Sequence, residues 1–99
     1  KGVPDLNYCQ NGKEIWIELK SIQGNKSQLS PFQIAWIHNR AKAGGNCYVL
    51  IRKNKEIRLF QPKTLEELQD LNWNSEPAIG TTAPYDWGHL FSSIYHSAK

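Results

Sequence analysis

Two acidic residues and a lysine stand at positions where they could hold a metal ion beside a substrate. Asp5 precedes an Asn-Gly pair at residues 11–12, Glu18 follows it, and Lys20 comes two residues after Glu18. A two-residue Asn-Gly turn joins antiparallel strands, and counting outward from this turn places Asp5 directly opposite Glu18. The Cβ atoms of such a pair lie about 5 Å apart.

Like charges directly opposite one another destabilise a sheet, so we expect a divalent cation between Asp5 and Glu18. Hard oxygen ligands suit Mg²⁺ or Mn²⁺. Lys20 lies on the face of Glu18, about 6.6 Å along the strand, where its ammonium could orient a water or stabilise charge on a phosphate. The alternative is structural, because an Asp before a strand is a common turn residue and an exposed Glu-x-Lys is a common solvated pair.

The elements that position these residues follow from the apolar and polar pattern. Residues 13–20 alternate strictly, so Ile15, Ile17 and Leu19 face one way and Glu18 faces the other. The pattern predicts, in chain order, a hairpin over 3–20, a helix over 31–43 that starts with a capping box, a central strand over 46–52, a strand over 57–60, a short helix over 65–71, a loop over 72–88 and a short helix within 86–99.

This order predicts an α/β fold with a mixed central sheet (hairpin, helix, strand, strand) flanked by helices. We expect one domain over residues 1–99, in which residues 72–99 form a C-terminal extension packed on the core with Leu90, Phe91 and Ile94 facing inward. Because the sequence starts with Lys1 and contains no methionine, we expect it to be part of a longer protein.

The composition narrows the class of protein without choosing a function. A net charge of +3 suits an anionic partner such as nucleic acid. No apolar run approaches the roughly 18 residues of a membrane helix, so we expect a cytoplasmic protein with no membrane partner. Cys9 and Cys47 are too few for a disulfide framework, and we expect both thiols to be buried and reduced.

The sequence resembles the PD-(D/E)XK nuclease superfamily at Pro4-Asp5 and at Glu18-Leu19-Lys20. The stretch over roughly residues 2–60 is similar to the VRR-NUC and Holliday-junction-resolvase-like branches of that superfamily. The likeness includes the order of hairpin, glutamine-bearing helix and strand. It implies a restriction-endonuclease-like fold and a further helix before the hairpin that would supply another acidic residue, which the sequence does not include.

The resemblance also implies roles for individual residues. Asp5, Glu18 and the backbone carbonyl of Leu19 would hold Mg²⁺, with Mn²⁺ as an alternative. Lys20 would be the catalytic lysine. Gln33 matches the glutamine that these branches carry on the helix after the motif, although a capping-box role explains it equally well. The metal would polarise the scissile phosphate and lower the pKa of a bound water.

Three further residues are candidates for contacts with DNA. Lys26 and Ser27 lie in the polar loop before the predicted helix, and Arg40 lies on the same helical stripe as Gln33. Each has a structural alternative. A solvated loop explains Lys26 and Ser27, and a favourable interaction with the helix dipole explains Arg40.

We therefore expect a Mg²⁺-dependent endonuclease that hydrolyses DNA, with a junction, a flap or a nick as its substrate. Cleavage of both strands would call for a homodimer, because one copy cuts one strand. Compact nucleases of this kind resemble phage proteins, which would act in the host cytoplasm. The alternatives are a nucleic-acid-binding module that keeps the nuclease scaffold without cutting, and a purely structural α/β domain.

Overall fold

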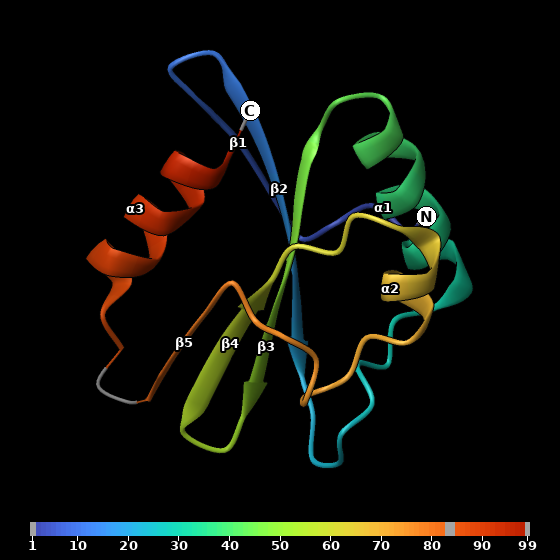
Figure 1. Ribbon diagram of the computed structural model, residues 1–99, viewed down its shortest axis with the longest axis vertical. Coiled ribbons are helices and arrows are strands. Elements are labelled where there is room, and N and C mark those ends of the chain that lie inside the picture. Colours follow the sequence, from blue (N-terminus) through green and yellow to red (C-terminus); the bar gives the residue numbers. More distant parts are fainter. Residues whose placement is uncertain (1, 83–84, 99) are drawn as a thin grey trace.

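The computed structural model describes residues 2–82 and 85–98 (Figure 1). One five-stranded sheet has the strand order β1-β2-β3-β4-β5 and carries helices on both faces. None of the helices in these ranges has the length and apolar character needed to cross a membrane. The elements are β1 (Leu6–Gln10), β2 (Lys13–Ser21), α1 (Pro31–Lys42), β3 (Asn46–Lys53), β4 (Glu56–Phe60), α2 (Leu65–Gln69), β5 (Ile79–Thr82) and α3 (Trp87–Ser97).

The β1–β2 hairpin has the register that the Asn-Gly turn predicts. Asn11 and Gly12 adopt φ values of 51° and 80°, which is the left-handed backbone that a two-residue hairpin turn requires. Leu6 pairs with Ile17 across the antiparallel ladder. Asp5 directly precedes this pair, so the ladder brings it to the level of Glu18, which follows Ile17.

The third strand is central, as its apolar sequence predicts. β3 pairs in parallel with β2 and antiparallel with β4, and β5 adds to β4 at the far edge. Val49 and Ile51 are buried on one face of β3, and Tyr48 is buried on the other. This arrangement confirms the predicted α/β fold with a mixed central sheet.

The two faces of the sheet carry separate apolar cores. Helices α1 and α2 lie on one face and α3 lies on the other (Figure 1). The core under α1 and α2 consists of Ile22, Ile37, Cys47, Val49, Ile51, Phe60, Leu68, Leu71 and Trp73. The core under α3 consists of Ile15, Ile17, Tyr48, Ile57, Leu59, Leu90, Ile94 and Ala98.

The predicted loop over residues 72–88 is wrong in part, because it contains β5. Ile79 pairs with Leu59 of β4, and the backbone N–H of Ala78 also donates to the carbonyl of Leu59 at 2.7 Å. A strand of four residues with a glycine at its second position, Gly80, shows too little alternation to be found by period. The pairing of β5 with β4 is therefore a tertiary effect.

Two burial predictions are also wrong. Phe91 is 45% exposed, because the buried side of α3 contains Leu90 and Ile94, whereas Phe91 directly follows Leu90 and so points in a different direction from the helix axis. Cys9 is exposed while Cys47 is buried. β1 is an edge strand, so the face of the sheet on which Cys9 lies is not covered by α1 at that point.

Candidate active site

Helix α1 packs against β2, and successive side chains of the helix contact successive side chains of the strand. Both elements present one row of side chains to the other, and the rows run in opposite directions along the chain. The meeting pairs are Gln33 with Glu18, Trp36 with Trp16, and Arg40 with Glu14. The helical stripe that contains Gln33 and Arg40 is therefore confirmed, and the start of α1 lies over the predicted metal site.

Glu18 is the central residue of this site. Only 3% of this residue is exposed, although its side chain carries an ionisable carboxyl group. Its Oε2 accepts a hydrogen bond from Nε2 of Gln33 at 2.9 Å and lies 3.8 Å from Nζ of Lys20. Its Oε1 is buried and has no hydrogen-bond partner among the described residues. A buried polar atom without a partner is costly, and this oxygen is available to accept a ligand.

The electrostatic environment of Glu18 opposes its ionisation. Burial and, to a smaller extent, the nearby carboxylate of Asp5 raise the pKa of this carboxyl, the Lys20 ammonium lowers it, and the net result is a pKa of about 7. One ammonium is thus insufficient to offset burial and a like charge. A divalent cation would stabilise both carboxylates in their ionised forms.

Asp5 is exposed and is held in place by the neighbouring strand. Its Oδ2 accepts a hydrogen bond from the backbone N–H of Leu19 at 2.9 Å. Leu19 directly follows Glu18, so this bond fixes Asp5 beside the buried carboxylate.

The segment before Asp5 packs against the start of α1 through Gly2, which lies outside the Pro4-Asp5 and Glu18-Leu19-Lys20 motifs. Gly2 has φ +80°, and a Cβ atom at this position would lie 2.5 Å from the carbonyl oxygen of Phe32. Only glycine fits both conditions without strain. The sequence signal was a glycine three residues before the aspartate of the motif, and this signal alone could not reveal the contact with α1.

The donor set fits a hard divalent cation. Mg²⁺ in proteins is commonly bound by one or two carboxylates and keeps several waters. Asp5 and Glu18 supply two carboxylates, and Oε1 of Glu18 has no hydrogen-bond partner in the part of the chain that the structure describes. Residues 2–82 and 85–98 contain no group of three or more His, Cys, Asp and Glu side chains that could hold a metal, so water, a backbone carbonyl or substrate oxygens would complete the coordination.

The side chain of Arg40 already has partners within the protein. Its guanidinium carbon lies 5.2 Å from the ring centre of Trp16 and 5.3 Å from that of Trp36, and its Nε lies 3.6 Å from Oε1 of Glu14. Trp16 therefore packs under α1. These internal contacts are sufficient to explain the position of the Arg40 side chain, so its contact with DNA stays a prediction.

The loop between β2 and α1 is anchored and not simply solvated. Ser27 is only 5% exposed, and its backbone N–H donates to the carbonyl of Leu71 at 3.3 Å. Lys26 forms an isolated β-bridge with Asn72, while its side chain is exposed. The expected contact of Ser27 with DNA does not fit its burial, because the residue fixes the loop from inside. Lys26 remains accessible.

Comparison with known proteins identifies the family. Residues 1–85 match the model of the archaeal Holliday junction resolvase (Hjc) family. A search of curated proteins found no match. The Hjc family lies within the PD-(D/E)XK nuclease superfamily, and the sheet with its flanking helices agrees with the restriction-endonuclease-like fold of that family. The match does not single out the VRR-NUC branch. The chain belongs to the archaeal Holliday junction resolvase (Hjc) family.

Proposed function

We propose that this protein is a Mg²⁺-dependent endonuclease that cleaves branched DNA such as a four-way junction. Membership of a resolvase family implies a nuclease that hydrolyses DNA. The observation that carries the finer proposal is the buried carboxylate of Glu18, whose Oε1 has no partner in the described structure and which lies near Asp5 and Lys20. The family match gives no support to an inactive scaffold or to a phage origin.

The metal would be held by Asp5, Glu18 and the backbone carbonyl of Leu19. When bound, the cation supplies Lewis acidity toward the phosphate and lowers the pKa of a coordinated water; Mn²⁺ would serve in the same way. The chain fixes the geometry of its ligands. Gln33 holds Oε2 of Glu18 and leaves Oε1 for the ligand, while the Leu19 N–H holds Asp5.

Lys20 would act on the substrate side of the site. Its side chain is 21% exposed, so its ammonium can be reached from solvent while it stays 3.8 Å from Glu18. A fixed positive charge at this position stabilises the negative charge that develops on the phosphate. Lys20 also favours the ionised form of Glu18, which the metal needs.

The partners follow from the same chemistry. The exposed side chain of Lys26 and the guanidinium of Arg40 are proposed contacts for the DNA backbone, and Ser27 supports the loop that carries Lys26. Cleavage of both strands of a junction would take two active sites, so a homodimer is part of the proposal, and so is a cytoplasmic location.

The test is cleavage of a synthetic four-way junction and nicking of a supercoiled plasmid, with Mg²⁺ or Mn²⁺ and with EDTA. We expect Glu18→Gln to reduce the cleavage rate by more than about 100-fold, since loss of an outer partner of a metal ligand alone costs about 10- to 100-fold. Gln33→Ala should fall in that smaller range. Glu76→Gln, which removes an exposed carboxylate far along the chain, is the control and should change the rate less than about twofold.

Two results would contradict the proposal. If the wild-type protein cuts neither substrate with any divalent metal and still binds DNA, the nuclease assignment fails. If Asp5→Ala and Glu18→Gln both cleave at the wild-type rate, the activity resides elsewhere in the molecule and the site assignment fails.

A further inference from the structure

The charges of this chain are divided sharply along the sequence. Residues 40–63 contain seven basic residues and one acidic residue, Glu56, whereas residues 64–86 contain five acidic residues and no lysine or arginine. The basic residues are Arg40, Lys42, Arg52, Lys53, Lys55, Arg58 and Lys63. The acidic residues are Glu66, Glu67, Asp70, Glu76 and Asp86. A polyanion would therefore be attracted by one part of this surface and repelled by another.

The fold gathers some of the basic residues at the turn between β3 and β4. Lys53 ends β3 and Lys55 lies in the turn, while Lys26 comes from the β2–α1 loop. Nζ of Lys53 donates to Oδ1 of Asn25 at 2.9 Å, and the backbone N–H of Trp73 donates to the carbonyl of Asn25 at 2.6 Å. The first bond joins the loop to the turn, and the second joins it to the segment that follows α2. We call Lys26, Lys53 and Lys55 the hairpin surface.

The hairpin surface keeps cations that the structure does not neutralise. Lys26 and Lys55 are exposed, and across residues 2–82 and 85–98 their ammonium groups have no hydrogen-bond or ion-pair partner. In contrast, Arg40 and Arg58 are each paired with a glutamate. Unpaired ammonium groups are available to phosphates at no cost of breaking an internal contact.

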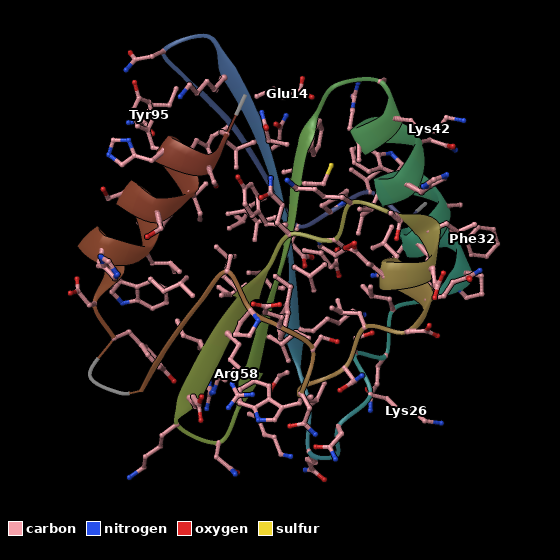
Figure 2. The ribbon with its side chains drawn as sticks, in the orientation of Figure 1. Glu14, Lys26, Phe32, Lys42, Arg58 and Tyr95 are labelled. Carbon is pink, nitrogen blue, oxygen red and sulfur yellow. The ribbon has the colours of Figure 1, made fainter. Side chains whose placement is uncertain are left out.

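The turn also forms a small cavity of about 310 Å³ between lysine side chains and an indole. It is lined by Lys53, Asn54, Lys55, Glu56 and Trp73. Arg58 braces one side, because its Nη1 donates to the Trp73 carbonyl at 2.8 Å and its Nε lies 2.9 Å from Oε2 of Glu56. Figure 2 shows Arg58 and Lys26 in the lower part of the view and Lys42 in the upper part, on α1.

Along the strand direction, this surface lies beyond the candidate active site. Glu18 is the parallel partner of Val49, and Lys20 is the partner of Ile51. Lys53 follows two residues after Ile51 on the same face, about 13 Å from the level of Val49 at roughly 3.3 Å per residue. Along the axis of a duplex, the phosphates of each strand recur about every 3.4 Å. The two sites are therefore about four nucleotides apart for DNA that runs along the strands.

We propose that the hairpin surface binds the DNA backbone about four nucleotides from the scissile phosphate and so sets the direction in which DNA leaves the active site. The inference rests on the proposed nuclease function. The exposed acids of α2, Glu66 and Glu67, repel a duplex that would cross that helix. DNA consequently runs from Glu18 and Lys20 toward the β3–β4 turn.

The test compares two double variants that each remove two exposed ammonium groups without an ion-pair partner among the described residues. Lys26→Gln with Lys55→Gln should weaken binding of a four-way junction by about 10- to 30-fold at 0.1 M salt and lower the slope of log K against log salt by about 2. The matched control is Lys42→Gln with Lys63→Gln. It changes the net charge equally, away from the turn, and should change the affinity less than about threefold.

A second arm locates the contact on the DNA. A neutral methylphosphonate placed three to five nucleotides from the cleavage position should weaken binding of the wild-type protein and leave binding of the Lys26→Gln/Lys55→Gln variant unchanged. Equal losses in both double variants would overturn the inference in favour of a general effect of net charge. If the hairpin variant binds as the wild type does while the wild type cleaves, the inference fails and the nuclease function stands. If the wild type neither binds nor cleaves junction DNA, both fail.

Discussion

The two faces of β2 show how one strand can stabilise a domain and hold a reactive group. On the face toward α3, Ile15 and Ile17 are 1% and 2% exposed and lie in a hydrophobic core. On the face toward α1, Glu18 is buried almost as deeply, at 3%, with an oxygen that has no partner in the described structure. Neighbouring residues of one strand therefore have equal burial and opposite energetic effects.

The difference follows from what each side chain gives up on leaving water. Burial of an isoleucine side chain contributes roughly 1.5–3 kcal/mol. Burial of a carboxyl group disfavours its ionised form, as the pKa of about 7 for Glu18 shows. The apolar face thus offsets the cost of the polar one, and strand alternation brings the two functions within one residue. The predictions below test this division.

The largest effect on stability should come from the apolar face. Ile17→Ala should lower the free energy of unfolding by about 2–5 kcal/mol, because it removes buried methyl groups and leaves a cavity under α3. Urea unfolding measures the change. The control is Leu19→Ala on the same strand and face, where the side chain is 43% exposed, and its loss should stay below about 1 kcal/mol. Similar losses in both variants would show that α3 does not seal this face.

The sequence was sufficient for the features that depend on local pattern. The Asn-Gly turn determines which residues pair, because both positions accept positive φ, and the alternation of residues 13–20 determines which side chains share a face. Together they predict that Asp5 meets Glu18 and that Lys20 lies beside it. The capping box at Ser30 similarly predicts where α1 begins.

The features that the sequence pattern does not predict depend on contacts between residues that are distant in the sequence. Phe91 and Leu90 are adjacent and equally apolar, and only the direction from which α3 packs on the sheet decides which is buried. The polar sequence around Ser27 predicts a solvated loop, whereas in the structure its backbone N–H donates to the carbonyl of Leu71. Gly2 looks unremarkable until the Phe32 carbonyl lies where its side chain would be. No periodicity encodes such contacts.

The next prediction concerns the polar face and pH in the absence of metal. Because the folded state raises the pKa of Glu18 from 4.5 to about 7, this group binds its proton more tightly when folded. Its contribution to stability is complete below pH 4.5 and is lost as pH rises to about 7. In EDTA, Glu18→Gln should remove this loss. The free energy of unfolding of the variant should therefore be about 2–3 kcal/mol higher than that of the wild type at pH 8 and equal to it near pH 4.5.

Addition of Mg²⁺ should reverse that comparison. A ligand that binds only the folded state stabilises it by RT ln(1 + [L]/Kd), about 2.7 kcal/mol at 100 times Kd. The wild type should gain this stabilisation at pH 8 and the Glu18→Gln variant should gain little. A Glu18→Gln variant that is less stable than the wild type in EDTA at pH 8 would contradict the assigned cost of burying this carboxylate.

The smallest effect on stability, and the most specific effect on the site, should come from Gly2→Ala. The added Cβ would meet the Phe32 carbonyl at 2.5 Å, so the segment that carries Asp5 must move away from α1. Gly12→Ala is the matched control, because Gly12 has the same φ of 80° with nothing within 4 Å of the added atom. The free energy of unfolding of both variants should fall by about 1 kcal/mol through the cost of positive φ.

Only Gly2→Ala should raise the Mg²⁺ concentration needed for half-maximal stabilisation and cleavage, by about 10-fold or more, in line with the loss of a partner that orients a metal ligand. An equal shift in Gly12→Ala would mean that the hairpin turn, and not the contact between Gly2 and α1, determines where Asp5 lies.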